Sequence, residues 1–315
     1  MNPAVPGPCV AIVDIGSNSI KVLVAARNAT GAVVPLKLRT VDARIGAGIS
    51  RAEPRLGEAG MARGVDAIES LLADAAAFHP VRTVLVATSA VRDAANGAEF
   101  RDRVRARCGH EIRILSGDEE ANLIGRGLTC DPALLGLENF YVFDLGGGSL
   151  ECLAFRARRI EQAVSLQLGC VRLTEKFVAD PAQPFPAAAA TAVAAHTRAT
   201  LGACGFAFSL PPGAAAIGTG GTITTVRTIF GARDGRAFEA TASTVRTSEL
   251  RELLAWLGGL TLAQRQQIPG LPPARADVFP TALATFLALA EAGGFSEFRN
   301  SVYNLRYGLA EQALG

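Results

Sequence analysis

One pattern occurs twice in the chain, as CVAIVDIGSNSIKVLVA at residues 9–25 and as NFYVFDLGGGSLECLAF at residues 139–155. Each copy has an apolar run, an aspartate, a glycine-containing turn that ends in serine, and a second apolar run. A short apolar run bounded by turn residues is typical of a strand that is buried on both faces, and two such runs joined by a glycine turn indicate a β-hairpin. The repeat therefore predicts a similar β-hairpin in each half of the chain.

The two turns, Asp14–Ser19 and Asp144–Ser149, have the chemistry of anion sites. A glycine-rich turn can direct several backbone N–H groups to one point, and without a Cβ a phosphate oxygen can approach closely. The serine adds a donor, and an ionised aspartate suits a metal ion or its water shell. An ordinary glycine hairpin turn is the alternative for either copy. A turn alone does not require aspartate at the end of a buried strand, so two matched copies favour phosphate binding.

Strand-like and helix-like segments alternate around the hairpins, which predicts an α/β fold with mixed sheets. At 315 residues the chain exceeds the size at which one core usually keeps growing, so we expect two domains. The predicted strands or extended segments are 33–45, 82–88, 111–115 and 214–217, the predicted helices are 57–78, 96–108, 170–179 and 187–203, and 247–315 is predicted as helices with breaks at 269–273 and 293–294.

The composition excludes several classes of protein. With 49% hydrophobic and 19% charged residues the chain is not predicted to be disordered, and its net charge of +2 lacks the basic excess of a nucleic-acid binder. No apolar run is long enough for a membrane span, and residues 1–8 do not resemble a signal peptide. The six cysteines are scattered without metal or redox spacing. We therefore expect a cytoplasmic protein in a reducing compartment, with no nucleic-acid or membrane partner.

The loop TSAVRDAANG, residues 88–97, follows a predicted buried strand and offers Ser89 and Arg92. In α/β sheets ligands gather beyond the carboxyl ends of strands, and an arginine there can bind two phosphate oxygens at once. The alternative is structural, with Ser89 as a helix N-cap and Arg92 paired with Asp93 or another neighbour.

The segment ILSGDEEANLIGRG, residues 114–127, begins a helix just after a predicted strand. Ser116 and Glu119 have the spacing of a capping box, and acidic residues are favoured at a helix start by the macrodipole. Capping explains Glu119 but leaves Glu120 without a role. A carboxylate held near a phosphate site could instead take a proton from an attacking water, and spacing alone does not choose between the two glutamates.

Two further features complete the predicted site. Gly218–Thr222, with the sequence GTGGT, follows a predicted strand and is a third anion-type loop. Glu151, two residues after Ser149, could share a metal ion with Asp144. Mg²⁺ commonly takes only one or two carboxylates, with water and substrate oxygens as its other ligands.

The motifs DIGSNS, ATSAVRDA, SGDEEA, DLGGGSLE, LGCVRLTEKF and GTGGT occur in this order, and together they resemble the exopolyphosphatase and guanosine pentaphosphate phosphohydrolase (Ppx/GppA) family. The resemblance covers about residues 10–310 and is to the short form, without the C-terminal helical domain. It implies the two-domain actin-like superfold of sugar kinases and heat-shock ATPases, with ribonuclease-H-like mixed sheets and an interdomain cleft. The implied domains are 1–125 plus 301–315, and 126–300.

The resemblance also assigns roles to residues. It implies that Glu120 activates the attacking water, that Arg92 grips phosphate, and that Mg²⁺ (or Mn²⁺) is held by Asp144 and Glu151, with Asp14 as the corresponding aspartate of the first loop. The implied phosphate-binding residues are Gly16, Ser17, Asn18, Ser19, Ser89, Gly146, Gly147, Gly148, Ser149, Gly220, Gly221 and Thr222. Tyr307 stands where the family commonly has an acid, so it receives no catalytic role.

The expected reaction is release of the terminal phosphate of inorganic polyphosphate, with guanosine pentaphosphate as the alternative substrate, and the resemblance makes a homodimer the expected assembly. Two other functions stay open. A kinase or ATPase of the same superfold would also use paired phosphate loops, although SGDEEA between the loops is the phosphatase hallmark. A regulator that binds the alarmone and hydrolyses it poorly would keep the same residues.

Overall fold

A computed structural model describes residues 7–315. Most of the segment 1–8, which does not resemble a signal peptide in sequence, therefore lies outside the described residues. The chain divides into two compact units, Met1–Leu135 with Tyr303–Gly315, and Gly136–Val302. The chain thus passes from unit 1 to unit 2 after Leu135, later than the boundary near residue 125 that the resemblance implied. The helix α4 (Gly117–Thr129) explains the difference, because it packs against α11 (Leu305–Ala313) within unit 1.

The sheet of unit 1 has five strands in the order β3-β2-β1-β4-β5. Its first hairpin joins β1 (Cys9–Ile15) to β2 (Ile20–Arg27), and β3 (Val33–Val41) pairs antiparallel with β2. On the other side of β1, β4 (Arg82–Ala87) and β5 (Ile112–Ile114) run parallel to it. Every residue of β1 is buried, as its apolar run predicted for a central strand.

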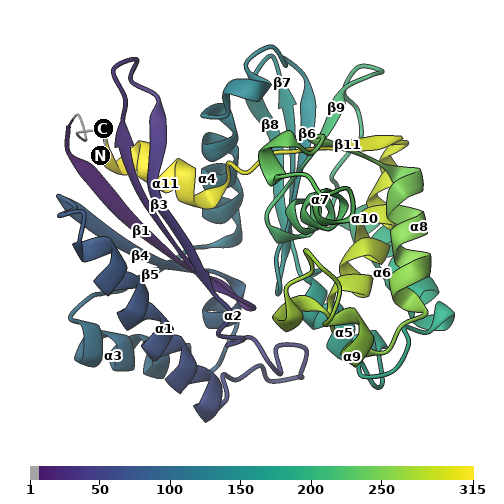
Figure 1. The fold of residues 1–315 in the computed structure, drawn as a ribbon, viewed down its shortest axis with the longest axis horizontal. Coiled ribbons are helices and arrows are strands. Elements are labelled where there is room, and N and C mark those ends of the chain that lie inside the picture. Colours follow the sequence, from purple (N-terminus) through teal and green to yellow (C-terminus); the bar gives the residue numbers. More distant parts are fainter. Residues whose placement is uncertain (1–6) are drawn as a thin grey trace. The chain divides into compact units, whose positions relative to one another are not determined.

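Helices cover both faces of this sheet (Figure 1). The helices α1 (Glu58–Ala76) and α3 (Gly97–Cys108) pack against each other on one face, and α4 and α11 pack together on the other face. The helix α1 lies within the predicted helix 57–78 and buries an apolar stripe that includes Met61, Ile68 and Leu71. Two short elements complete the unit, α2 (Ser89–Arg92) and the 3₁₀ helix η1 (Pro132–Leu134).

The sheet of unit 2 has six strands in the order β10-β11-β9-β6-β7-β8. The second hairpin joins β6 (Phe140–Leu145) to β7 (Leu150–Arg156), and β8 (Arg159–Leu166) pairs antiparallel with β7. The strands β9 (Ala215–Thr219) and β11 (Glu297–Asn300) continue the sheet in parallel with β6, and β10 (Thr244–Arg246) closes it antiparallel. From β8 to β11 this sheet has the topology of the first sheet, so the sequence repeat reflects a repeated architecture.

The helices of unit 2 pack around α10 (Phe279–Gly293), which contacts α6 (Ala187–Ala203) and α8 (Thr247–Gly258). Stacked and edge-on aromatic rings fill the core beside the strands, including Phe140 against Phe155 with centroids 4.5 Å apart. The remaining helical elements are α5 (Cys170–Phe177), α7 (Gly221–Arg233), η2 (Phe238–Ala240), α9 (Leu262–Arg265) and η3 (Pro273–Arg275).

One expectation for the C-terminal region is wrong. Residues 247–315 are predicted as helices with breaks at 269–273 and 293–294, but Glu297–Asn300 forms the strand β11, which lies between β10 and β9 in the sheet. The strand is too short and too polar to show an apolar run, and it is stabilised by its neighbours β9 and β10. In residues 7–315 we find no helix with the length and apolar character that a bilayer crossing requires.

Candidate active site

The loop of the first hairpin is held by hydrogen bonds to its carbonyl groups. The amide of Gly16 donates to the carbonyl of Ser19 at 3.2 Å, which closes the turn. The carbonyl groups of Ser17 and Asn18 accept from the amides of Gly46 and Arg44, at 2.8 and 2.9 Å. Within the described residues the amides of Ser17 and Asn18 donate no backbone hydrogen bond. The loop therefore has N–H groups available for an anion.

The loop of the second hairpin has the same arrangement. Gly146 donates to the carbonyl of Ser149 at 3.0 Å, as Gly16 does to Ser19. The carbonyls of Gly146 and Gly147 accept from the first amides of α5, and the guanidinium of Arg172 donates to the carbonyl of Gly148 at 3.0 Å. In the described part of the chain the amides of Gly147 and Gly148 form no backbone hydrogen bond. Both predicted phosphate loops thus present unbonded amides while their carbonyls are engaged.

The contact between α5 and the second loop is close. A Cβ at Gly169 would lie 2.3 Å from backbone atoms of Gly147 and Gly148, so any other residue at this position would clash with the loop. The helix therefore packs directly on the loop and fixes its backbone. This contact gives the LGCVRLTEKF motif a structural reason.

The strand register places Asp144 directly opposite Glu151 in the antiparallel pair β6–β7. Glu151 is buried, and Ser165 of β8 donates to its Oε1 at 2.7 Å. Side chains directly opposite one another in an antiparallel pair are near neighbours, and like charges there are destabilising unless a cation offsets them. The two carboxylates therefore fit a divalent cation.

No larger cluster competes with this pair. Among residues 7–315, no group of three or more His, Cys, Asp or Glu side chains could hold a metal ion by itself. A site of two carboxylates suits Mg²⁺, which takes its other ligands from water and substrate oxygens.

Asp14 has a different environment although it occupies the matching position. The register of β1–β2 places Lys21 opposite Asp14, where the second hairpin has Glu151 opposite Asp144. An opposite-charge pair needs no metal to offset it. The donor set of the first loop therefore fits a metal ion less well than that of the second.

Arg92 and Glu120 form an ion pair within unit 1. Nη1 of Arg92 donates to Oε2 of Glu120 at 2.8 Å and to the carbonyl of Leu115 at 3.0 Å. Nε of the same guanidinium lies 3.5 Å from Oδ1 of Asp93. Glu120 is buried, in contrast to most carboxylates at a helix start. The structural alternative predicted that Arg92 pairs with Asp93, and this pair is present. It also predicted Ser89 as a helix N-cap, but Thr88 is the N-cap of α2.

Glu119 is occupied by helix capping. Its carboxylate accepts from the amide of Ser116 at 2.8 Å, its own amide donates to Oγ of Ser116 at 3.1 Å, and Arg113 donates to Oε1 at 2.7 Å. The Ser116 amide first, and Arg113 second, hold the pKa of Glu119 below its usual value. The predicted capping box is confirmed. The geometry therefore separates the two glutamates, because Glu119 caps the helix and Glu120 points into the protein.

The third loop lies beside Asp144 in unit 2. Thr219 is the parallel partner of Asp144, and a Cβ at Gly220 would lie 2.2 Å from Oδ1 of Asp144. The loop GTGGT and the second hairpin therefore meet at one edge of the sheet, as expected for the carboxyl ends of parallel strands.

Arg275 is a residue of this site that the sequence did not indicate. A Cβ at Gly221 would lie 1.7 Å from Nη1 of Arg275, so the guanidinium rests on the third loop. Its Nε is buried and has no hydrogen-bond partner among the described residues. Arg275 belongs to a proline-flanked segment far from GTGGT in the chain, and only the unusual PPAR sequence there could have drawn attention to it.

Unpartnered buried polar atoms also mark the predicted loops. Nδ2 and Oδ1 of Asn18 and Oγ1 of Thr222 are buried and have no hydrogen-bond partner within residues 7–315. Buried polar groups without partners are rare in folded proteins, and they are found where a site binds a polar ligand. Ser17 and Ser89 also meet, with their hydroxyl oxygens 3.4 Å apart. Each unit thus carries its own set of the predicted residues.

Comparison with protein families gives a match to the Ppx/GppA phosphatase family over residues 23–314. The chain is 30% identical over 322 residues to exopolyphosphatase 2 of Mycobacterium tuberculosis, covering 97% of this chain and 98% of the relative. It is 29% identical to the guanosine-5'-triphosphate,3'-diphosphate pyrophosphatase of Aeromonas salmonicida over 98% of this chain. The chain spans only 60% of the length of that relative.

Solved structures show the same fold. A crystal structure of an exopolyphosphatase from Cytophaga hutchinsonii superposes with a TM-score of 0.87 at 22% identity, over 97% of both chains. The Ppx/GppA protein of Aquifex aeolicus superposes with a TM-score of 0.77 at 22% identity, over 98% of this chain and 98% of that chain. At these identities the structures establish the two-unit architecture with mixed sheets.

Proposed function

Because the chain belongs to the Ppx/GppA phosphatase family, we propose that it releases the terminal phosphate of inorganic polyphosphate by hydrolysis. The observation that carries this proposal is the buried carboxylate of Glu120, held by Arg92 in the same unit as a phosphate-type loop. The guanidinium of Arg92 lies 2.8 Å from this carboxylate, and a carboxylate held in place is a group that can accept a proton from water.

In this mechanism Glu120 accepts a proton from water as the water oxygen attacks the terminal phosphorus. The bond from that phosphorus to the bridging oxygen breaks, and the shortened chain leaves with its negative charge. Such a transition state needs water aligned with the breaking bond and positive groups around the equatorial oxygens. The unbonded amides of both hairpin loops support this role, and Arg92 would both hold Glu120 and contribute positive charge.

Asp144 and Glu151 are the residues that we propose for a Mg²⁺ or Mn²⁺ ion, on the basis of their cross-strand pairing. A divalent cation there would neutralise negative charge on phosphate oxygens. We assign Asp14 to the water shell rather than to direct coordination, because Lys21 stands opposite it. The remaining residues of the three loops, with Ser89, are proposed to bind phosphate.

A metal titration tests the ion site. Glu151→Gln should raise the Mg²⁺ concentration that gives half-maximal activity, while Glu161→Gln on the neighbouring strand β8 should leave it unchanged. If both variants show the wild-type Mg²⁺ dependence, Glu151 does not bind the ion.

Guanosine pentaphosphate is the second substrate candidate, supported by the likeness to the Aeromonas enzyme. Polyphosphate is preferred because the relative named an exopolyphosphatase is covered almost completely by this chain. Phosphate release from long polyphosphate, short polyphosphate and guanosine pentaphosphate, measured with Mg²⁺ and with Mn²⁺, separates these candidates. Transfer of phosphate from ATP to an acceptor would indicate a kinase, and tight alarmone binding without turnover would indicate a regulator. We also propose a homodimer, testable by light scattering, and a cytoplasmic location.

A further inference from the structure

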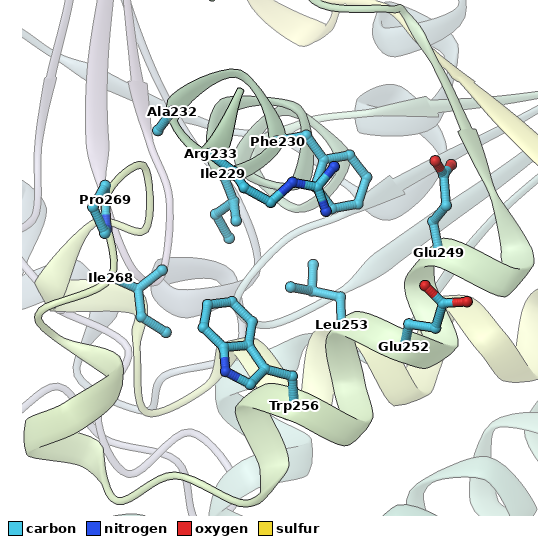
Figure 2. A pocket seen from close by; sticks show the side chains of 10 residues that line it. All are labelled: Ile229, Phe230, Ala232, Arg233, Glu249, Glu252, Leu253, Trp256, Ile268 and Pro269. Atoms are coloured by element: carbon cyan, nitrogen blue, oxygen red, sulfur yellow. The ribbon is translucent and has the colours of Figure 1, made fainter. Parts of the chain in front are cut away.

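A cavity with a volume of about 590 Å³ lies within unit 2, away from the predicted phosphate loops (Figure 2). Its walls are the C-terminal half of α7, one face of α8, and the turn after α9 that contains Ile268 and Pro269. Pockets for small organic ligands commonly have volumes of about 300–1,000 Å³ and apolar or aromatic walls with a few polar groups. The cavity has the size and the composition of such a site.

The two helices bring their lining residues together by helical spacing. Glu249, Glu252, Leu253 and Trp256 recur at intervals of three and four on α8, so they share one face. Figure 2 shows the indole of Trp256 and the side chain of Leu253 on the cavity side of this helix, with both carboxylates farther along it. Phe230 and Arg233 stand side by side on α7.

The charged side chains at the cavity differ in whether they have a partner of opposite charge. Arg233 lies over the ring of Phe230, 4.9 Å from its centroid, and its Nε is 3.0 Å from Oδ1 of Asp234. Glu249 uses one carboxylate oxygen to cap the helix. Glu252 is exposed and has no ion pair or hydrogen bond to another described side chain. The guanidinium is thus already paired, whereas at least one carboxylate is not.

The indole of Trp256 adds a second group that attracts cations. The residue is 51% exposed, and the face of an indole is the strongest aromatic partner for a positive charge. A single exposed aromatic residue needs no explanation by itself. Here it lines a cavity together with an unpaired carboxylate and apolar side chains such as Leu253 and Ile268.

We propose that this cavity binds a small organic monocation with an apolar or aromatic body, such as a primary or quaternary ammonium compound. The apolar walls would bury the body of the ligand, and the carboxylates of Glu252 and Glu249 with the indole of Trp256 would bind its charge. Polyanions are excluded, because the same carboxylates repel them.

The site is separate from the phosphate loops of its own unit. The helix α7 begins at Gly221 in the third loop, and its C-terminal residues line the cavity. A helix of 13 residues is about 20 Å long. One ligand of the proposed size cannot reach both ends.

Tryptophan fluorescence reports this site directly, because Trp256 is the single tryptophan of the chain. The chain of residues 1–315 is titrated with phenethylammonium, with the neutral 2-phenylethanol and with the anionic 3-phenylpropionate. We expect a saturable emission change with the cation, binding about two- to fivefold weaker for the alcohol, and weaker still for the anion. Added salt should weaken the binding of the cation and leave the binding of the alcohol unchanged.

Paired substitutions test the source of the preference. Glu252→Gln keeps the shape of the side chain and should remove most of the preference for the cation over the alcohol. Glu138→Gln, an exposed position outside the cavity, should leave it intact. The proposal is overturned if the alcohol binds as tightly as the cation in the wild-type protein, if Glu252→Gln keeps the full preference, or if the cation gives no saturable signal by fluorescence and no heat by calorimetry.

Discussion

Two adjacent side chains, Glu119 and Glu120, have the same chemistry and opposite environments. Glu119 lies on the exposed side of α4, where the backbone and Arg113 hold it in place. The next residue along a helix is rotated by about 100°, which turns Glu120 into the protein and toward Arg92. Position on the helix therefore decides which of them can serve catalysis.

Glu120→Gln should lower kcat for phosphate release by about 10²- to 10⁴-fold, since an amide cannot accept the proton. Glu119→Gln is the matched control and should keep the wild-type kcat. It should lower the free energy of unfolding by less than about 1 kcal/mol, because glutamine still completes the capping box and only the exposed ion pair with Arg113 is lost. Steady-state kinetics and urea denaturation of both variants measure these effects. Equal losses of kcat in the two variants would refute the assignment of Glu120 as the base.

Tyr307 is expected to make the protein sensitive to alkali. Burial, reinforced by the nearby Tyr303, raises the pKa of Tyr307 to about 12 from its ordinary value of 10. The folded state therefore holds the phenolic proton more tightly than the unfolded state does. The resulting stability is present below pH 10 and is lost as the pH rises from 10 toward 12.

Denaturation midpoints measured across this pH range should fall less steeply for Tyr307→Phe than for the wild type. Spectrophotometric titration should show one phenol fewer in the late-titrating fraction. An unchanged pH profile in Tyr307→Phe would mean that the phenol titrates normally.

At the scale of elements, α4 and α11 approach each other through two glycines. A Cβ at Gly308 would lie 1.9 Å from the carbonyl oxygen of Leu123, and one at Gly127 would lie 2.0 Å from that of Asn304. The helices therefore pack backbone against backbone, and α11 is fixed on unit 1 although it lies at the far end of the chain. This contact also fixes the helix that carries Glu120.

Gly308→Ala should lower the free energy of unfolding by about 1–3 kcal/mol, because the methyl group has no space between the helices. Gly202→Ala is the control, since Gly202 is exposed on α6 and no atom lies within 4 Å of the added Cβ. The free energy of unfolding of that variant should rise by about 0.5–1 kcal/mol, because its unfolded chain has a lower entropy. Urea denaturation compares the two, and stabilisation by both substitutions would show that α11 does not pack as described.

At the scale of the whole molecule, local patterns predicted local structure well. The repeated hairpin was visible because apolar runs and turn glycines are contiguous in sequence, and its turn bond recurs at Gly16 and Gly146. The strand Glu297–Asn300 was missed because its pairing partners, rather than its own residues, determine its structure. The contacts of Arg92 with Glu120 and of Arg275 with Gly221 join residues far apart in the chain, and no local pattern encodes such distances.

The division into units predicts how the chain behaves when it is cut. Gly136–Val302 is one continuous segment, and it contains a complete six-stranded sheet with its own helices and aromatic core. A segment of this length with a closed set of core contacts is large enough to fold alone. Met1–Leu135 without Tyr303–Gly315 would instead lack α11 and expose the apolar face of its sheet.

We therefore expect the fragment 136–302 to unfold cooperatively, with Trp256 emission like that of the full chain, and the fragment 1–135 to be much less stable. The first fragment should release no phosphate from polyphosphate, because Arg92 and Glu120 are in the other unit. Circular dichroism with thermal melting, fluorescence and a phosphate assay measure the three properties. Phosphate release by 136–302 alone would place the catalytic base in unit 2 and remove Glu120 from the mechanism.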